Sequence, residues 1–307
     1  MKTTHRILTA LLITLTLSVV GVAHTAYAAG PTTVDLGTAD PFAILAGTGV
    51  TDVPTSAITG NVGVSPATGA SITGLTCAEV TGTIYTVDAA GPVCRVVNGP
   101  LMVTAKNDLT AAYIDAAGRT PVTTVPTELG GTTKTAGVYN SASTTFGITA
   151  GAGALVLDGQ GDPSAVFIFE MDASGTGLTV GPGSTVSLVN GAQACNVFWR
   201  VDTATINTTA VFKGNILALT SIAVANGANI EGRLLARNGN VTLISDTITR
   251  AVCATTTPGG SSSTTPGLPN TGVQPENKSG VIWAAGISTA AVVLATSFFL
   301  LRKKRTI

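Results

Sequence analysis

Histidine is almost absent from this 307-residue chain, and both copies, His5 and His24, lie close to the N-terminus. The rest of the chain therefore has no histidine general base, no serine–histidine triad and no histidine metal ligand. Aromatic residues make up only 5% of the chain and charged residues only 10%. An aromatic-lined sugar groove and a strongly charged binding surface are therefore not expected.

The two ends of the chain predict export and attachment. A basic start, an apolar run and a small-residue cleavage pattern predict a signal peptide over residues 1–28, although a first transmembrane helix is the alternative. Near the other end, an apolar segment at 281–301 is long enough to span a bilayer. A basic tail at 302–307 would stay on the cytoplasmic side. Residues 255–267 contain only Thr, Ser, Pro and Gly and predict a flexible linker.

A short motif stands between that linker and the apolar segment. It reads Leu268-Pro269-Asn270-Thr271-Gly272. Motif, apolar span and basic tail in this order resemble the cell-wall sorting signal of Gram-positive bacteria; a plain single-pass anchor is the alternative. The resemblance implies that a sortase attacks the Thr271–Gly272 bond and joins Thr271 to peptidoglycan. The body would then face outward, with the membrane involved only before sorting.

Charge and cysteine content narrow the function of the exported part, about residues 29–271. It keeps nine basic and fifteen acidic residues, a net charge near −6, which argues against binding nucleic acid or anionic lipid. Four cysteines in an exported chain suggest disulfides. We expect Cys77 to pair with Cys94. The pairing of Cys195 with Cys253 stays open, because about three β-strand spacings, roughly 14 Å, would separate them unless the chain turns back.

An eighteen-residue repeat predicts the architecture of the body, residues 29–254. Residues 197–214, 215–232 and 233–250 align with one another, and residues 43–60 fit the same frame. The blocks are rich in Val, Ile, Thr and Gly and contain short alternating apolar runs, which is typical of strands and turns. We therefore predict an all-β solenoid of triangular coils, each with three strands, stacked about 4.8 Å apart.

One helix is expected beside this solenoid. The first strand of each coil is apolar on both sides and needs a cover. Apolar residues at helical spacing between 101 and 117 can supply it: Met102, Ala105, Leu109, Ala112, Tyr113 and Ala116. We place a helix over about 101–117, and a non-repetitive cap insertion over about 66–100.

An enzyme site made of carboxylates is a further possibility, because many β-helical proteins cleave polysaccharides. A glycosidase needs two converging carboxylates about 5–10 Å apart. The aligned coils place no two acids in one column, and Lys213 and Glu231 share a column as a surface ion pair. No enzyme, cofactor or metal site is therefore predicted. The acids considered were Asp158, Asp162, Glu170, Asp172, Asp202, Glu231 and Asp246.

Several segments together resemble the ice-binding protein family of bacteria, fungi, yeasts and diatoms. They are LGTADPFAILAG at 36–47, ITGNVGVSP at 58–66, DLTAAY at 108–113, AAGRTP at 116–121, LDGQGDP at 157–163, NGAQACNVFW at 190–199 and LARNG at 235–239. The resemblance implies a right-handed, discontinuous β-helix with three faces and one long helix packed along one of them. It also implies that ice is the partner. A surface adhesin or structural module on the same scaffold, without ice activity, is the alternative.

The ice-contacting residues have to be chosen from the aligned columns, because the family's ice face follows no strict motif. The first strand is covered by the helix, and the third carries Lys213 and Glu231. The second strand offers uncharged, mostly small side chains on its outward side. The predicted ice-binding residues are Thr51, Thr203, Thr205, Ser221, Ala223, Asn240 and Thr242, on a protein expected to be a monomer.

Overall fold

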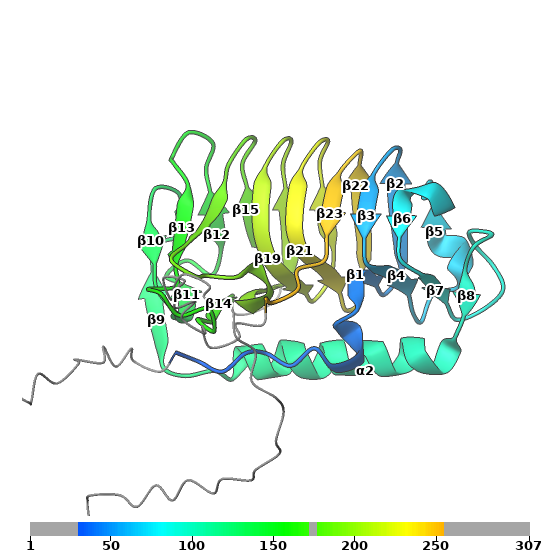
Figure 1. The fold of residues 1–307 in the computed structure, drawn as a ribbon, viewed down its shortest axis with the longest axis horizontal. Coiled ribbons are helices and arrows are strands. Elements are labelled where there is room, and N and C mark those ends of the chain that lie inside the picture. Colours follow the sequence, from blue (N-terminus) through cyan, green and yellow to red (C-terminus); the bar gives the residue numbers. More distant parts are fainter. Residues whose placement is uncertain (1–29, 172–176, 255–307) are drawn as a thin grey trace, which may run out of the picture. The chain divides into compact units, whose positions relative to one another are not determined.

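The computed structural model describes residues 30–171 and 177–254, which lie within one compact unit. Their strands stack in parallel around a common core, and one helix lies along the stack (Figure 1). No helix among these residues is long and apolar enough to cross a membrane. The predicted signal peptide, linker, sorting motif, membrane span and basic tail all lie outside the described residues.

The strands form three faces, which we call the covered, the open and the third face. The covered face consists of β8 (Val96–Val97), β7 (Ile84–Thr86), β4 (Asn61–Val64), β1 (Phe42–Ala46), the second halves of β21 (Asn229–Ala236) and β19 (Val211–Ala218), then β17 (Val197–Val201), β14 (Phe167–Glu170), β11 (Gly137–Ser141) and β9 (Val122–Val125). The open face consists of β12 (Phe146–Ile148), β15 (Gly177–Val180), β18 (Thr203–Ile206), β20 (Ile222–Val224), β22 (Asn240–Ile244), β2 (Gly49–Val53) and β5 (Ile72–Thr73).

The third face completes the triangle. It consists of β10 (Thr133–Lys134), β13 (Leu155–Asp158), β16 (Val186–Val189), the first halves of β19 and β21, then β23 (Thr247–Thr249), β3 (Ala57–Thr59) and β6 (Val80–Thr81). Short 3-10 turns are η1 (Gly37–Ala39), η2 (Gly69–Ser71), η3 (Cys77–Glu79) and η4 (Ala194–Asn196). The parallel β architecture with one long helix agrees with the sequence-based prediction.

One corner of the coil differs from the prediction. We expected three separate strands per coil, but β19 and β21 each run without a break from the third face onto the covered face. Glycine permits this corner: Gly214 has φ +116°, and a Cβ on Gly232 would lie 1.8 Å from the Gly214 carbonyl oxygen. Only glycine lets the two backbones approach so closely. The third strand of one coil and the first of the next are therefore one continuous strand.

The N-terminal coil packs against the C-terminal coil, although the two are far apart in the sequence. β1 pairs with β21, β2 with β22 and β3 with β23. The chain then adds β4, β5 and β6 as a further coil on the outer side of the first. The predicted cap insertion at 66–100 is therefore wrong in part, since this coil and β7 and β8 occupy much of it. Its two-residue strands are too short to show periodicity.

Helix α2 (Gly99–Ala117) carries the chain from one end of the stack to the other. It begins directly after β8, at one edge of the covered sheet, and ends before β9, at the opposite edge (Figure 1). Asn98 Oδ1 caps it by accepting from the Leu101 amide at 3.1 Å. The six apolar residues predicted as its inner stripe are all buried, against outward side chains of the covered face such as Leu217 and Leu235. The helix starts two residues earlier than predicted.

The interior and two disulfides hold the coils together. Phe169 stacks on Trp199 with ring centroids 4.1 Å apart, inside the stack. Cys77 and Cys94 form a disulfide with Cα atoms 5.9 Å apart. Cys195 and Cys253 also form one, at 5.4 Å, so the chain after Arg250 does turn back along the coils. The second pair ties the end of the unit to the start of β17.

Candidate functional site

The open face carries all seven residues that the sequence predicted for ice contact. Its strands alternate between buried apolar side chains and outward ones, as in Thr203–Ile206, where Ala204 and Ile206 point inward. The predicted residues occupy outward positions and are exposed or half-buried. In β22, Val241 and Leu243 are buried, so Asn240 and Thr242 point outward. Ala223 pairs with Thr242, which places the last coil one residue out of the eighteen-residue frame.

The outward residues of the open face form columns that run across the coils. The strand registers place one column of outward residues in the order Gly147, Thr179, Thr205, Ala223, Thr242, Thr51 and Thr73. Thr203, Ser221 and Asn240 lie beside it, two residues earlier on their strands. Neighbours in a column are about 4.8 Å apart and neighbours along a strand about 6.6 Å apart. The result is a regular two-dimensional array.

On these seven strands the outward side chains are uncharged, and some of them hold one another in place; beyond β12 the column ends at a charged residue, Glu128, which pairs with Gly147. The strands of the open face contain one charged residue, Asp52, and its side chain points inward. Thr73 Oγ1 donates to Thr51 Oγ1 at 3.2 Å, and Ser221 Oγ donates to Asn240 Oδ1 at 2.8 Å. Contacts of this kind restrict rotamers on a backbone that is already fixed by the sheet. The face therefore presents hydroxyl and methyl groups at defined positions.

Sequence reasoning missed two threonines of this array. Thr73 and Thr179 lie in coils outside the eighteen-residue frame, so no column could be assigned to them. A partial signal was present for Thr179, because Leu178-Thr179-Val180 alternates between buried and exposed positions. This alternation marks Thr179 as outward, but which face it lies on follows only from the order of the coils in space.

The third face is less uniform. Lys213 Nζ and Glu231 Oε2 form an ion pair at 2.7 Å, as the sequence predicted. The column then continues through Thr249, Thr59 and Thr81. Charge is therefore confined to one part of this column, but it interrupts the flat, uncharged character that distinguishes the open face.

Buried acids brace the corner between the open and the third face. Ser56 Oγ donates to Asp52 Oδ1 at 2.6 Å, and the Ser56 amide donates to Glu79 Oε1 at 3.0 Å. Asp246 accepts from the Ala228 amide at 2.9 Å. Burial raises the pKa of Asp246 to about 6 and also raises the pKa of Asp52. Because the Asp246 amide also donates to Ser56 Oγ at 3.0 Å, these groups join four neighbouring coils at this corner.

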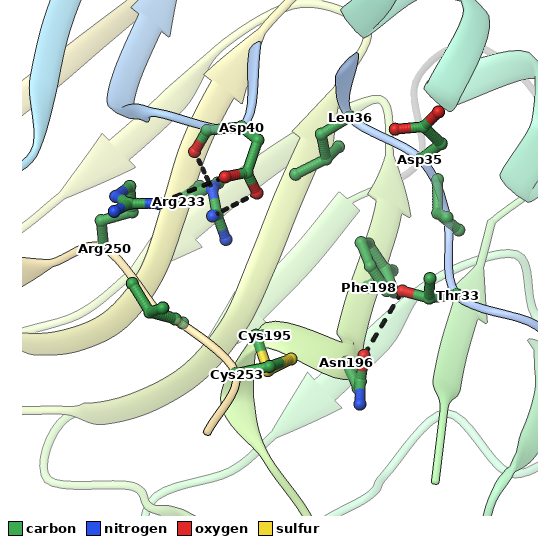
Figure 2. A pocket seen from close by; sticks show the side chains of 13 residues that line it. Thr33, Asp35, Leu36, Asp40, Cys195, Asn196, Phe198, Arg233, Arg250 and Cys253 are labelled. Atoms are coloured by element: carbon green, nitrogen blue, oxygen red, sulfur yellow. Dashed lines mark hydrogen bonds and ion pairs between the residues drawn. A yellow bond between two sulfur atoms is a disulfide. The ribbon is translucent and has the colours of Figure 1, made fainter. Parts of the chain in front are cut away.

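A cleft of about 330 Å³ was considered as a small-molecule site (Figure 2). Its polar side chains are engaged with one another. Arg233 Nη2 contacts Asp40 Oδ1 at 2.6 Å, Arg250 contacts the same carboxylate at 3.2 Å, and Thr33 donates to Asn196 at 3.3 Å. The Asp40 contacts join the N-terminal segment to the last coil, and the Thr33 contact joins it to Asn196, directly before β17. The cleft is therefore a structural joint and offers no converging, unengaged catalytic groups.

The acids considered as an enzyme site stay apart or serve the fold. Asp158 and Asp162 accept from backbone amides in their own turn. Asp202 accepts from Thr220, and Glu231 pairs with Lys213. Among residues 30–171 and 177–254, no three Asp, Glu, Cys or His side chains gather in a way that could hold a metal ion. Asp172 lies outside the described residues.

Comparison with known proteins identifies the family. The family model "Ice-binding-like" matches residues 44–249. An ice-binding protein of Flavobacterium frigoris is 42% identical over 220 residues, which cover 70% of this chain and 76% of that relative. An ice-binding protein of Colwellia sp. is 43% identical over 226 residues, covering 72% and 85%. These relatives are described as ice-binding proteins, in agreement with the prediction that this chain is not an enzyme.

A solved structure gives the same answer for the fold. The domain from the Shewanella frigidimarina ice-binding protein matches with a TM-score of 0.65 and 32% identity, covering 73% of this chain and all of that domain. Family model, relatives and structure thus agree over the same part of the chain. The chain belongs to the Ice-binding-like family.

Proposed function

We propose that this protein binds ice through its open face, without catalysis or a cofactor. The observation that carries the proposal is the uncharged array of outward Thr, Ser, Ala and Asn side chains along six neighbouring parallel strands, from β15 to β5. The names of its relatives support ice as the partner. The seven contact residues are Thr51, Thr203, Thr205, Ser221, Ala223, Asn240 and Thr242.

The rigidity of the face supports adsorption to a crystal. A sheet backed by a packed core changes little on binding, so little ordering of side chains opposes adsorption. Methyl groups restrict the orientation of neighbouring water, and hydroxyl groups hydrogen-bond to it. An array with a fixed spacing can therefore hold water in an ordered layer that merges with ice.

The proposal also places the protein on a Gram-positive cell wall. Its support is the sequence: a signal peptide at 1–28, a linker at 255–267 and the motif Leu268-Pro269-Asn270-Thr271-Gly272 before an apolar span. Sortase and peptidoglycan would be the partners of this step, and the outward body would act as a monomer. Expression with Thr271→Ala should move the protein from the muramidase-released wall fraction to the membrane fraction. Unchanged wall linkage would contradict the anchoring step.

Ice affinity itself is tested on the polypeptide 29–255, which contains the whole described unit and both disulfides. A single ice hemisphere is grown slowly, and protein is assayed in ice and liquid. We expect enrichment in ice, and loss of enrichment when Thr205 and Thr242 are both changed to Tyr. Exclusion of the unaltered protein from ice would refute the proposal and leave a surface adhesin on this scaffold.

A further inference from the structure

Two large apolar side chains stand on the open face beside the predicted contact residues. Val53, at the end of β2, is 53% exposed, and Ile244, at the end of β22, is 37% exposed. The two residues pair in register across their strands. Because side chains two positions apart point to the same side of a strand, Val53 lies beside Thr51 and Ile244 beside Thr242. These four side chains form one continuous block.

The backbone under this apolar pair is held on both strands. The Val53 carbonyl accepts from the Ser245 amide at 2.9 Å. The Ile244 amide donates to Asp246 Oδ2 at 2.8 Å, and the Ile244 carbonyl accepts from the Gly227 amide at 3.2 Å. Asp52, between Thr51 and Val53, points inward and accepts from Ser56. The pair is therefore presented in a fixed position before any partner arrives.

We propose that Val53 and Ile244 are additional ice-contact residues, which extend the binding surface from the threonine column to the corner of the solenoid. The inference rests on the proposed function and deepens it. Single exposed apolar residues are ordinary on proteins. Here two of them lie in register on rigid strands and continue an uncharged face, so the apolar surface that ice would cover becomes larger.

The size of the pair favours ice over a protein partner. A stable protein interface covers about 800 Å² on each side and usually includes polar contacts at its rim. Two aliphatic side chains supply only a small part of that area. At the edge of a flat array that adsorbs to ice as a whole, the same two side chains add contact area without a complementary pocket on a partner protein.

The test compares paired substitutions in the ice-hemisphere assay. Val53→Asp with Ile244→Asp should lower the ice-to-liquid ratio about tenfold, because charges on the surface would have to lose water on contact with ice. The matched control is Val103→Asp with Ile114→Asp on α2, where the original side chains are 54% and 62% exposed. The control should bind as the unaltered protein does.

A milder pair keeps the test independent of folding. Val53→Thr with Ile244→Thr retains strand propensity and removes methyl groups, and should lower the ratio about threefold if apolar contact matters. Unchanged binding by both substituted pairs, while Thr205→Tyr abolishes it, would overturn the inference and leave the proposed function standing. Exclusion of the unaltered protein from ice would overturn both.

Discussion

Substitution of Arg233 by Met should destabilise the protein far more than substitution of its partner Asp40 by Asn. Arg233 is 2% exposed and connects the last coil with the N-terminal coil, whereas the Asp40 side chain is 54% exposed. Arg233 Nε donates to the Asp40 carbonyl at 2.8 Å and Nη1 to Asn215 Oδ1 at 2.8 Å. Burial lowers the pKa of Arg233 to about 10, so the guanidinium stays charged at neutral pH.

The loss in unfolding free energy depends on which buried groups each substitution leaves without a hydrogen-bond partner. Without the guanidinium, the fully buried Asn215 Oδ1 loses its donor, and an orphaned buried acceptor costs about 1–3 kcal/mol. The Asp40 carbonyl also loses a donor, so we expect a total loss of about 3 kcal/mol. Asp40→Asn keeps a side-chain oxygen that can accept from Arg233 and leaves the bonds to the Asp40 carbonyl and to Asn215 in place, so only about 1 kcal/mol is expected.

The assay is urea unfolding at pH 7, followed by circular dichroism, with the free energy of unfolding extrapolated to water. Arg233→Met should lower the unfolding midpoint clearly, and Asp40→Asn only slightly. Equal losses for the two variants would refute the reasoning, since they would mean that the charge on Asp40, and not the buried hydrogen bonds of Arg233, joins the coils.

Three further outcomes are expected. Gly232→Ala should cost more than about 3 kcal/mol in the same unfolding assay, because its Cβ would lie 1.8 Å from the Gly214 carbonyl oxygen; Gly147→Ala, whose Cβ would meet nothing within 4 Å, should be neutral. The Asp246 pKa is raised to about 6 when folded, so its stabilising contribution is full below about pH 4 and is lost as pH rises through 6. The difference in unfolding free energy between the protein and Asp246→Asn should change by up to about 3 kcal/mol across that window, and a pH-independent difference would contradict the burial argument. Gly147→Thr with Ala223→Thr fills the threonine column and should raise the ice-to-liquid ratio; a lower ratio in a folded variant would count against the column.

The coil architecture could be predicted because the same local pattern of apolar, polar and turn residues repeats at a fixed period. The alternation in the second strand placed Thr203, Thr205 and Thr242 on one outward face, and the apolar spacing in α2 identified each buried helix residue. Both predictions depend on the regular spacing at which side chains return to one side of a strand or helix, and this spacing can be read from one sequence.

The remaining features depend on contacts that no local pattern displays. The continuous strands β19 and β21 require glycines that let neighbouring coils approach, and the extra coil at 61–81 has strands of only two residues on two of its faces. The Cys195–Cys253 disulfide depends on the path of the chain after the last coil. Thr73 and Thr179 join the open face only once the order of coils in space is known.

The most direct test of the central claim compares one tyrosine on the open face with one on the third face. Thr205→Tyr and Thr247→Tyr place the same bulk at exposed strand positions on different faces. Thermal hysteresis of the two purified variants is measured beside that of the unaltered protein. The account predicts that Thr205→Tyr loses most of the activity and Thr247→Tyr keeps it; the reverse result would contradict the assignment of the open face.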